Sequence, residues 1–150
     1  LKIIQNFDPT ENLANAHEIS IGYIDDYNLY FRAKHVVTEQ QRVLAAYDAL
    51  KLGRIDYLGE LLWASHTSLN EDYDVAGDSL NSLIFYSKKF KGCIGARMTG
   101  AGFSGCAIAL VEKSTLKRFC DYVGRKYETD QKIKADFYVV ESSDGVKRIQ

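Results

Sequence analysis

A glycine-rich stretch in the second half of the chain limits its possible folds more than any other feature. Five of the eleven glycines fall between Gly92 and Gly105, and residues 95–106 read GARMTGAGFSGC. Glycine lacks a Cβ atom and adopts positive φ without strain, so the backbone can turn tightly here and approach a bound molecule closely. The apolar run from Cys106 to Val111 predicts a buried strand after the loop. A ligand-binding loop and a plain turn between strands are both compatible with this pattern.

The loop contains a literal G-x-G-x-x-G at Gly100, Gly102 and Gly105, but it does not predict a dinucleotide site. That fingerprint requires a helix directly after the glycines, because the helix N-terminus holds the pyrophosphate. Here a strand follows, and Asp121, at the spacing of a ribose-binding acid, falls inside a later predicted helix. A P-loop sequence is also absent. We therefore expect a loop between antiparallel strands.

Composition indicates one globular domain. The chain has 150 residues, of which 46% are hydrophobic, and a formal net charge of −1 with scattered lysines and arginines. This pattern predicts neither nucleic acid nor a membrane surface as a partner. The sequence also lacks a recognisable signal peptide and an apolar run of about 18 residues. Because the chain begins with Leu1, we expect it to be the interior of a longer polypeptide.

The three cysteines, Cys93, Cys106 and Cys120, lie in apolar settings without C-x-x-C spacing or a neighbouring histidine pair. An odd number without metal-ligand spacing favours reduced, buried thiols. We therefore expect a cytoplasmic protein with no cysteine metal site.

Hydrophobic periodicity predicts helices over about 8–17, 26–52, 55–70, 78–89 and 114–128, and strands over 93–98, 106–112 and 135–141. Residues 19–24 are left unassigned, and the tail from Ser142 is expected to be a loop or an edge. The helices at 26–52 and 55–70 meet at Gly53 and predict an αα-hairpin. The whole order implies an α+β fold: a small antiparallel sheet of three strands with helices on one face and the helix at 114–128 packed across it.

Each long predicted helix carries one apolar face that we expect to point inward. In chain order these faces comprise Val36, Val43, Tyr47 and Leu50; Ile55, Leu58, Leu62 and Leu69; Leu80, Leu83, Ile84 and Ser87; and Leu116, Phe119, Cys120, Val123 and Tyr127.

Two other groups of polar residues have simple structural interpretations. His35 and His66 lie on predicted helices among apolar or aromatic neighbours, which favours packing or capping over catalysis. The acidic residues Glu71, Asp72 and Asp74 lack the spacing of a Ca²⁺ loop, so a solvated helix end is expected.

The aromatic residues Tyr23, Tyr27, Tyr30 and Phe31 are expected to make core contacts, because no basic groove accompanies them as in a nucleic-acid stacking platform. The residues alone therefore indicate an α+β domain with one ligand-type loop and no visible acid, base or nucleophile.

The loop GARMTGAGFSGC resembles the third motif of the galactokinase branch of the GHMP kinases, and the resemblance covers most of the chain. Residues 32–39, with Arg42 and Val43, resemble the start of the long helix of the C-terminal domain in that branch. Residues 61–73 resemble the helix and turn that follow, and residues 135–140 resemble the closing strand. The prefix from Arg97 to Gly100 is similar to galactokinases rather than to mevalonate or homoserine kinases.

This resemblance implies that residues 1–150 are a ferredoxin-like GHMP kinase C-terminal domain without its N-terminal lobe. It further implies an enzyme of the galactokinase branch, which transfers the γ-phosphoryl group of ATP, with Mg²⁺, to the anomeric hydroxyl of galactose in a cleft between two lobes. Its sugar-binding signature, Ser-rich phosphate loop and catalytic Asp–Arg pair belong to the N-terminal lobe and are not found here. The chain alone is therefore expected to be inactive, with no catalytic residue and no metal ligand of its own.

The resemblance also assigns the binding residues. It implies that one wall of the cleft is formed by Thr99, Gly100, Ala101, Gly102, Phe103, Ser104 and Gly105. We expect Gly102 to approach the transferred phosphoryl group most closely. Ser104 stands where the family usually has glycine, and its hydroxyl is expected to bond within the loop. Two alternatives stay open: a galactokinase-like sugar sensor without turnover, and a stand-alone ligand-binding module.

Overall fold

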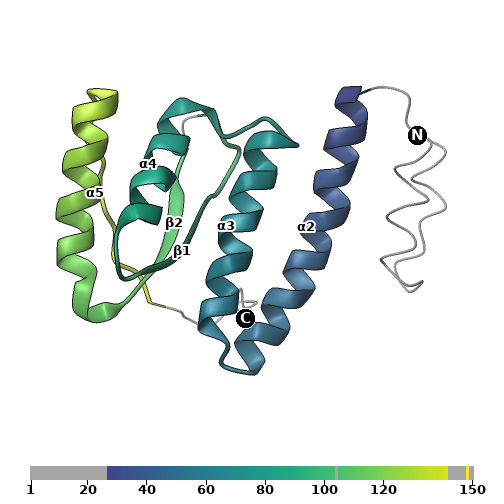
Figure 1. Cartoon of the computed structure of the whole chain (residues 1–150), viewed down its shortest axis with the longest axis horizontal. Coiled ribbons are helices and arrows are strands. Elements are labelled where there is room, and N and C mark those ends of the chain that lie inside the picture. Colours follow the sequence, from purple (N-terminus) through teal and green to yellow (C-terminus); the bar gives the residue numbers. More distant parts are fainter. Residues whose placement is uncertain (1–26, 104, 142–147, 149–150) are drawn as a thin grey trace.

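The structure, a computed structural model, describes residues 27–103, 105–141 and 148. Its elements, in chain order, are α2 (Tyr27–Lys51), α3 (Ile55–Glu71), α4 (Gly77–Lys89), β1 (Cys93–Met98), β2 (Ala107–Val111), the short 3₁₀ turn η2 (Lys113–Thr115) and α5 (Leu116–Gln131). Figure 1 shows the helices in the order α5, α4, α3 and α2 across the molecule. The expected helix at 8–17, the unassigned residues 19–24 and most of the tail lie outside the described residues.

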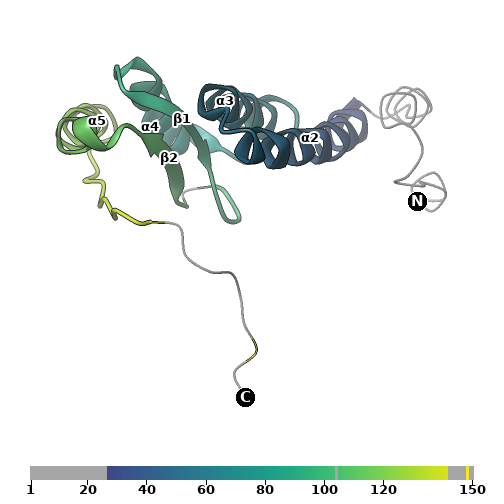
Figure 2. The same cartoon turned by 90° about the horizontal axis from the view of Figure 1, so that it is seen from below.

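The α+β class and the helices on one side of the sheet are confirmed (Figure 2). β1 and β2 pair antiparallel, from Cys93 opposite Val111 to Met98 opposite Ala107, as a connection this short requires. The αα-hairpin is also confirmed, since α2 and α3 are joined only by residues 52–54 and pack against each other.

The expected third strand at 135–141 is wrong, because the sheet of the described residues has two strands. Alternating side chains suit an extended backbone, but a strand also needs a neighbouring backbone to bond. Here Phe137 packs on α5 instead, with its ring 6.4 Å from that of Phe119. Tyr138 and Val140 remain 84% and 83% exposed.

The expected inward face of α2 is also wrong. Val36, Val43, Tyr47 and Leu50 are all more than half exposed, at 59%, 53%, 57% and 58%. Their spacing identifies an apolar face of the helix but not the direction in which that face points. The buried residues of α2 are His35 and Ala49, on a face whose polar side chains bond to α3 and β1.

The helix α3 lies very close to β1 because glycines face each other there. A Cβ atom on Gly95 would come 2.6 Å from the Cα of Gly59, and one on Gly59 would come 2.8 Å from the carbonyl carbon of Ile94. One turn further along α3, the Trp63 indole N–H donates to the Ile94 carbonyl at 3.0 Å. The position of β1 is therefore set by backbone-to-backbone contact with α3.

The expected faces of α4 and α5 are confirmed, since Leu80, Ile84, Phe119, Val123 and Tyr127 are buried. The placement of α5 across the sheet is wrong, however, because α5 packs mainly against α4. α3 and α4 already cover β1, so a two-stranded hairpin leaves little surface for a third helix.

The apolar core under the glycine loop joins α3, α4 and the end of β1. It contains Leu69, Ala76, Leu80 and Met98, with Tyr73, Val75 and Ala107 partly buried around it. Because Met98 belongs to this core, the base of the loop is anchored in it.

We expect Gly59→Ala to lower the free energy of unfolding by about 2 kcal/mol, because overpacking at the Ile94 backbone outweighs the higher helix propensity of alanine. The matched control is Gly124→Ala in α5, whose Cβ would lie 3.2 Å from the ring of Phe137, a side chain that is free to shift. That variant should be neutral or up to about 1 kcal/mol more stable. Urea denaturation measures both, and a Gly59→Ala protein as stable as the parent would contradict the close contact.

Candidate ligand-binding loop

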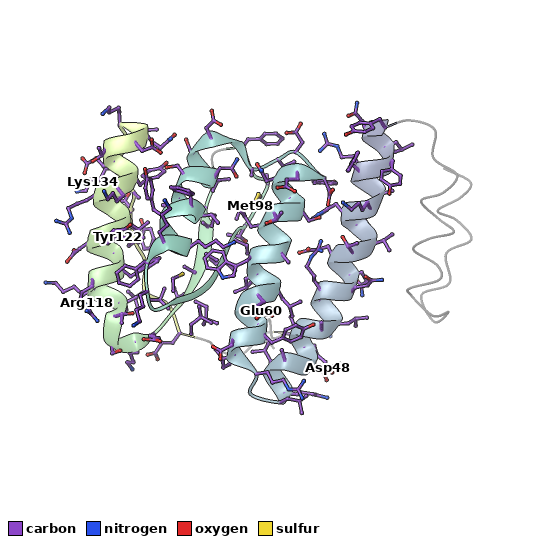
Figure 3. All side chains as sticks on the ribbon, viewed as in Figure 1. Asp48, Glu60, Met98, Arg118, Tyr122 and Lys134 are labelled. Atoms are coloured by element: carbon purple, nitrogen blue, oxygen red, sulfur yellow. The ribbon has the colours of Figure 1, made fainter. Side chains whose placement is uncertain are left out.

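The residues proposed from the sequence form one loop between β1 and β2. The Thr99 N–H donates to the Cys106 carbonyl at 2.9 Å and closes the loop at its base. Met98, just before it, is only 2% exposed and lies between α3 and α4 (Figure 3). Residues 99–103 and Gly105 are described, whereas Ser104 lies outside the described residues.

The tip of the loop docks on the turn between α3 and α4. The Phe103 N–H donates to the Val75 carbonyl at 2.8 Å, and Phe103 itself has a φ of 62°. Gly102 has a φ of 86°, and a Cβ there would collide with the same Val75 carbonyl oxygen. The contact of the loop tip with Val75 therefore explains why residue 102 is a glycine. The approach of Gly102 to a ligand stays a prediction.

The open part of the loop is at Gly100 and Ala101, which are both exposed. Gly100 has a φ of 79°, and no heavy atom lies within 4 Å of the position of a Cβ there. Within the described part of the chain, the N–H groups of Gly100, Ala101 and Gly102 have no backbone acceptor. Consecutive N–H groups of this kind suit an anionic ligand.

The start of the loop is tied to α2 and α3 by a half-buried carboxylate. Glu39 accepts hydrogen bonds from Ser65 Oγ at 2.6 Å, Arg42 Nε at 2.7 Å and Arg97 Nη1 at 3.0 Å. Arg97 Nε also donates to the Met98 carbonyl at 2.9 Å. Burial alone would raise the pKa of Glu39, but the Ser65 and Arg42 hydrogen bonds and the two arginine charges lower it. Glu39 is therefore an anion at neutral pH.

A second polar group holds the end of α3. His35 Nδ1 lies 2.9 Å from Ser68 Oγ, and Ser68 donates in turn to Asp72 at 2.8 Å. Since the serine proton goes to Asp72, the histidine Nδ1–H donates to Ser68. Lys34 Nζ completes the group with a 2.7 Å hydrogen bond to Asp72.

The packing roles expected for the two histidines are confirmed. Burial lowers the pKa of His35 and that of His66, so both are neutral near pH 7. His66 Nδ1 accepts a long, 3.4 Å hydrogen bond from the Met98 N–H. His66 thus supports the start of the loop and His35 the end of α3, both from inside the domain.

Several expectations about the surface are wrong. The side chain of Asp72 is only 10% exposed and is not part of a solvated helix end, although Glu71 and Asp74 are exposed as expected. Tyr27 is 75% exposed and stacks on Phe31 rather than entering the core.

The cysteines are unpaired, but Cys106 is exposed rather than buried. Burial raises the pKa of Cys93 to about 11, so this thiol stays protonated at neutral pH. Among the described residues, no three His, Cys, Asp or Glu side chains are grouped to hold a metal ion. None of the described helices has the length and apolar character needed to cross a bilayer.

Two shallow hollows of about 180 Å³ each lie away from the loop. One lies between α3 and α4, and the other lies beside the start of α2 and the end of α3; neither is lined by loop residues. Both are small compared with pockets of roughly 300–1,000 Å³ that enclose small molecules. Neither hollow encloses the exposed loop residues Gly100 and Ala101, so a binding site that encloses a ligand there would include a second wall.

The anchoring residues Glu39, Ser65 and Arg97 were missed at the sequence level. Their partners are 26 and 58 residues apart, so no local spacing reveals them. Arg97 stands out in the sequence only as part of the glycine motif.

The chain is similar to one known protein family and to several known proteins. The family described as GHMP kinases C terminal matches residues 46–129. The chain is 49% identical to a galactokinase of Halalkalibacterium halodurans over 82% of its own length and 31% of that protein. It is 40% identical to a galactokinase of Exiguobacterium sibiricum over its whole length and 39% of that protein.

A solved structure also matches. The crystal structure of Lactococcus lactis galactokinase complexed with galactose superposes with a TM-score of 0.83 and 40% identity, over 92% of this chain and 37% of that one. The chain thus spans about a third of the length of the relatives that it matches.

We expect the two loop glycines to respond differently to alanine. Gly102→Ala should lower the free energy of unfolding by about 2–3 kcal/mol, because the methyl group meets the Val75 carbonyl and resists positive φ. Gly100→Ala should cost only about 1 kcal/mol, from backbone strain in open space. Thermal and urea unfolding of both variants test this, and equal losses would argue against docking of the loop tip.

Proposed function

Because this chain belongs to the GHMP kinase family and matches galactokinases over 82–100% of its length, we propose that it is the C-terminal domain of a galactokinase. In the full-length protein, the anomeric oxygen of galactose attacks the γ-phosphorus of ATP as the bond to ADP breaks. The hydroxyl proton passes to a base outside this chain. The observation that carries the proposal is the open glycine loop, which presents the family-like sequence from Arg97 to Gly105 on a rigid base.

We propose that the seven residues from Thr99 to Gly105 form one wall of the active-site cleft. Phosphoryl transfer depends mainly on positioning and on stabilising negative charge. The N–H groups of Gly100, Ala101 and Gly102, which have no described backbone acceptor, would donate to phosphate oxygens. The empty space beside Gly100 lets a phosphate group approach the backbone.

The remaining ligand groups belong to the part of the protein beyond this chain. Glu39 and Asp72 are already engaged by Arg42, Arg97 and Lys34, so they do not suit Mg²⁺. We propose that an N-terminal lobe binds galactose, Mg²⁺ and most of ATP and packs against this domain. The proposed partners are thus that lobe, ATP and galactose, without nucleic acid or membrane, in the cytoplasm.

The full-length protein is expected to release ADP in a galactose-dependent manner with ATP and Mg²⁺. The 150-residue chain alone is expected to give no ADP above a no-protein control, because one wall cannot hold ATP or activate a hydroxyl. A coupled ADP assay with and without galactose measures both. Galactose binding without ADP release would instead indicate a sugar sensor, and activity of the isolated chain would overturn the assignment of the chemistry to the missing lobe.

We expect Gly100→Ala in the full-length protein to lower kcat by at least about tenfold, equivalent to roughly 1.4 kcal/mol of transition-state stabilisation. The added methyl group occupies the space proposed for phosphate, while the fold is little affected because nothing contacts it. Gly53→Ala, at another positive-φ glycine with an open Cβ position far from the loop, is the control and should keep parental kinetics. If the Gly100 variant kept parental kinetics, the loop would be a structural turn and not a wall of the active site.

A further inference from the structure

One arginine determines how the glycine loop leaves the core. Arg97 is the residue of β1 before Met98, and its planar guanidinium makes two hydrogen bonds in different directions. Nη1 donates to Glu39 of α2 at 3.0 Å, and Nε donates to the Met98 carbonyl at 2.9 Å. Because the guanidinium is rigid, fixing one side of it fixes the other. The backbone where the loop begins is thus linked to a side chain on a distant helix.

Glu39 is itself held in one orientation. Ser65 and Arg42 donate to it alongside Arg97, so three donors from three elements converge on one carboxylate. The side chains of Glu39 and Arg97 are only 19% and 29% exposed. Charges in such a position are costly to leave unpaired, which favours a single arrangement of the pair.

The same face of α2 also supports the platform on which the loop tip rests. Lys34 and His35 hold Asp72 and Ser68 at the end of α3. Three residues further along, the Val75 carbonyl accepts the Phe103 N–H. Polar side chains of α2 therefore bond to the start of the loop through Arg97 and to the end of α3, three residues before the Val75 carbonyl that holds the loop tip.

We propose that Glu39 and Arg97 are a positioning pair that sets the conformation of the glycine loop for phosphoryl transfer. This inference rests on the proposed function and deepens it, because it names residues outside the loop, one of them before the matched segment 46–129, that act on the reaction. Neither residue touches substrate. Glu39 orients the guanidinium, the guanidinium holds the Met98 carbonyl, and Met98 sets the direction of Thr99 and Gly100.

Three variants of the full-length protein separate this role from general stability. Glu39→Gln keeps the shape and removes the charge that holds Arg97. Arg97→Lys keeps the charge but lacks the fork needed for two directed hydrogen bonds. Ser82→Ala is the matched control, since the Ser82 hydroxyl of α4 donates to Asp130 of α5 at 2.6 Å, a polar contact between two other elements.

Hydrogen exchange of the Met98 and Thr99 amides, together with steady-state kinetics and urea unfolding, reports on the pair. We expect both amides to exchange at least tenfold faster in Glu39→Gln and in Arg97→Lys. We also expect kcat to fall at least fivefold, with less than a twofold change in the KM for galactose. Ser82→Ala should leave the exchange of these amides and kcat within twofold of the parent, whatever its effect on unfolding.

Unchanged exchange in Arg97→Lys, or equal acceleration in Ser82→Ala, would overturn the pairing. Arg97→Lys decides the matter if Glu39→Gln does not fold. The double variant Glu39→Gln/Arg97→Lys should have a kcat no lower than that of the less active single variant, because the two residues act as one unit. The two proposals fail separately. If the parent protein released no ADP in response to galactose, the proposed kinase function would be refuted. The effect of the two variants on amide exchange would still test the pairing of Glu39 with Arg97.

Discussion

The contact between α3 and β1 is the constraint on which the rest of the domain depends. Gly59 and Gly95 let a helix and a strand approach at backbone distance, which no pair of larger residues would allow. Trp63 and His66, further along α3, then donate to or accept from the backbone of β1 at Ile94 and Met98. One helix thus lines up the whole strand, and the strand ends where the glycine loop begins.

Glycine serves two different purposes within the loop that follows. At Gly102 the absence of Cβ lets the loop tip meet the Val75 carbonyl, so the residue is needed for folding. At Gly100 no heavy atom lies near the position of a Cβ, and this is where we propose that a ligand approaches the backbone. The glycine motif therefore contains one residue that fixes the loop to the rest of the domain and another that lies open to solvent.

The polar inner face of α2 explains why its apolar outer face is exposed. Lys34, His35 and Glu39 find partners on α3 and β1, and a helix cannot turn both faces toward the same neighbour. The outward residues Val36, Val43 and Tyr47 then form an apolar strip on the outside of the described domain.

The sequence by itself determined the local elements, because helix and strand periods and glycine positions are properties of neighbouring residues. The strand Cys93–Met98, the start of α3 at Ile55 and the face of α5 with Phe119 and Val123 were all predicted correctly. The binding role of the loop residues was assigned by the resemblance of the motif and stays a prediction. Tertiary structure decided which face of α2 points inward, whether residues 135–141 find a pairing partner, and which residues anchor the loop. These depend on contacts such as Glu39 with Arg97, 58 residues apart, which become visible only when the chain has folded and brought the charges together.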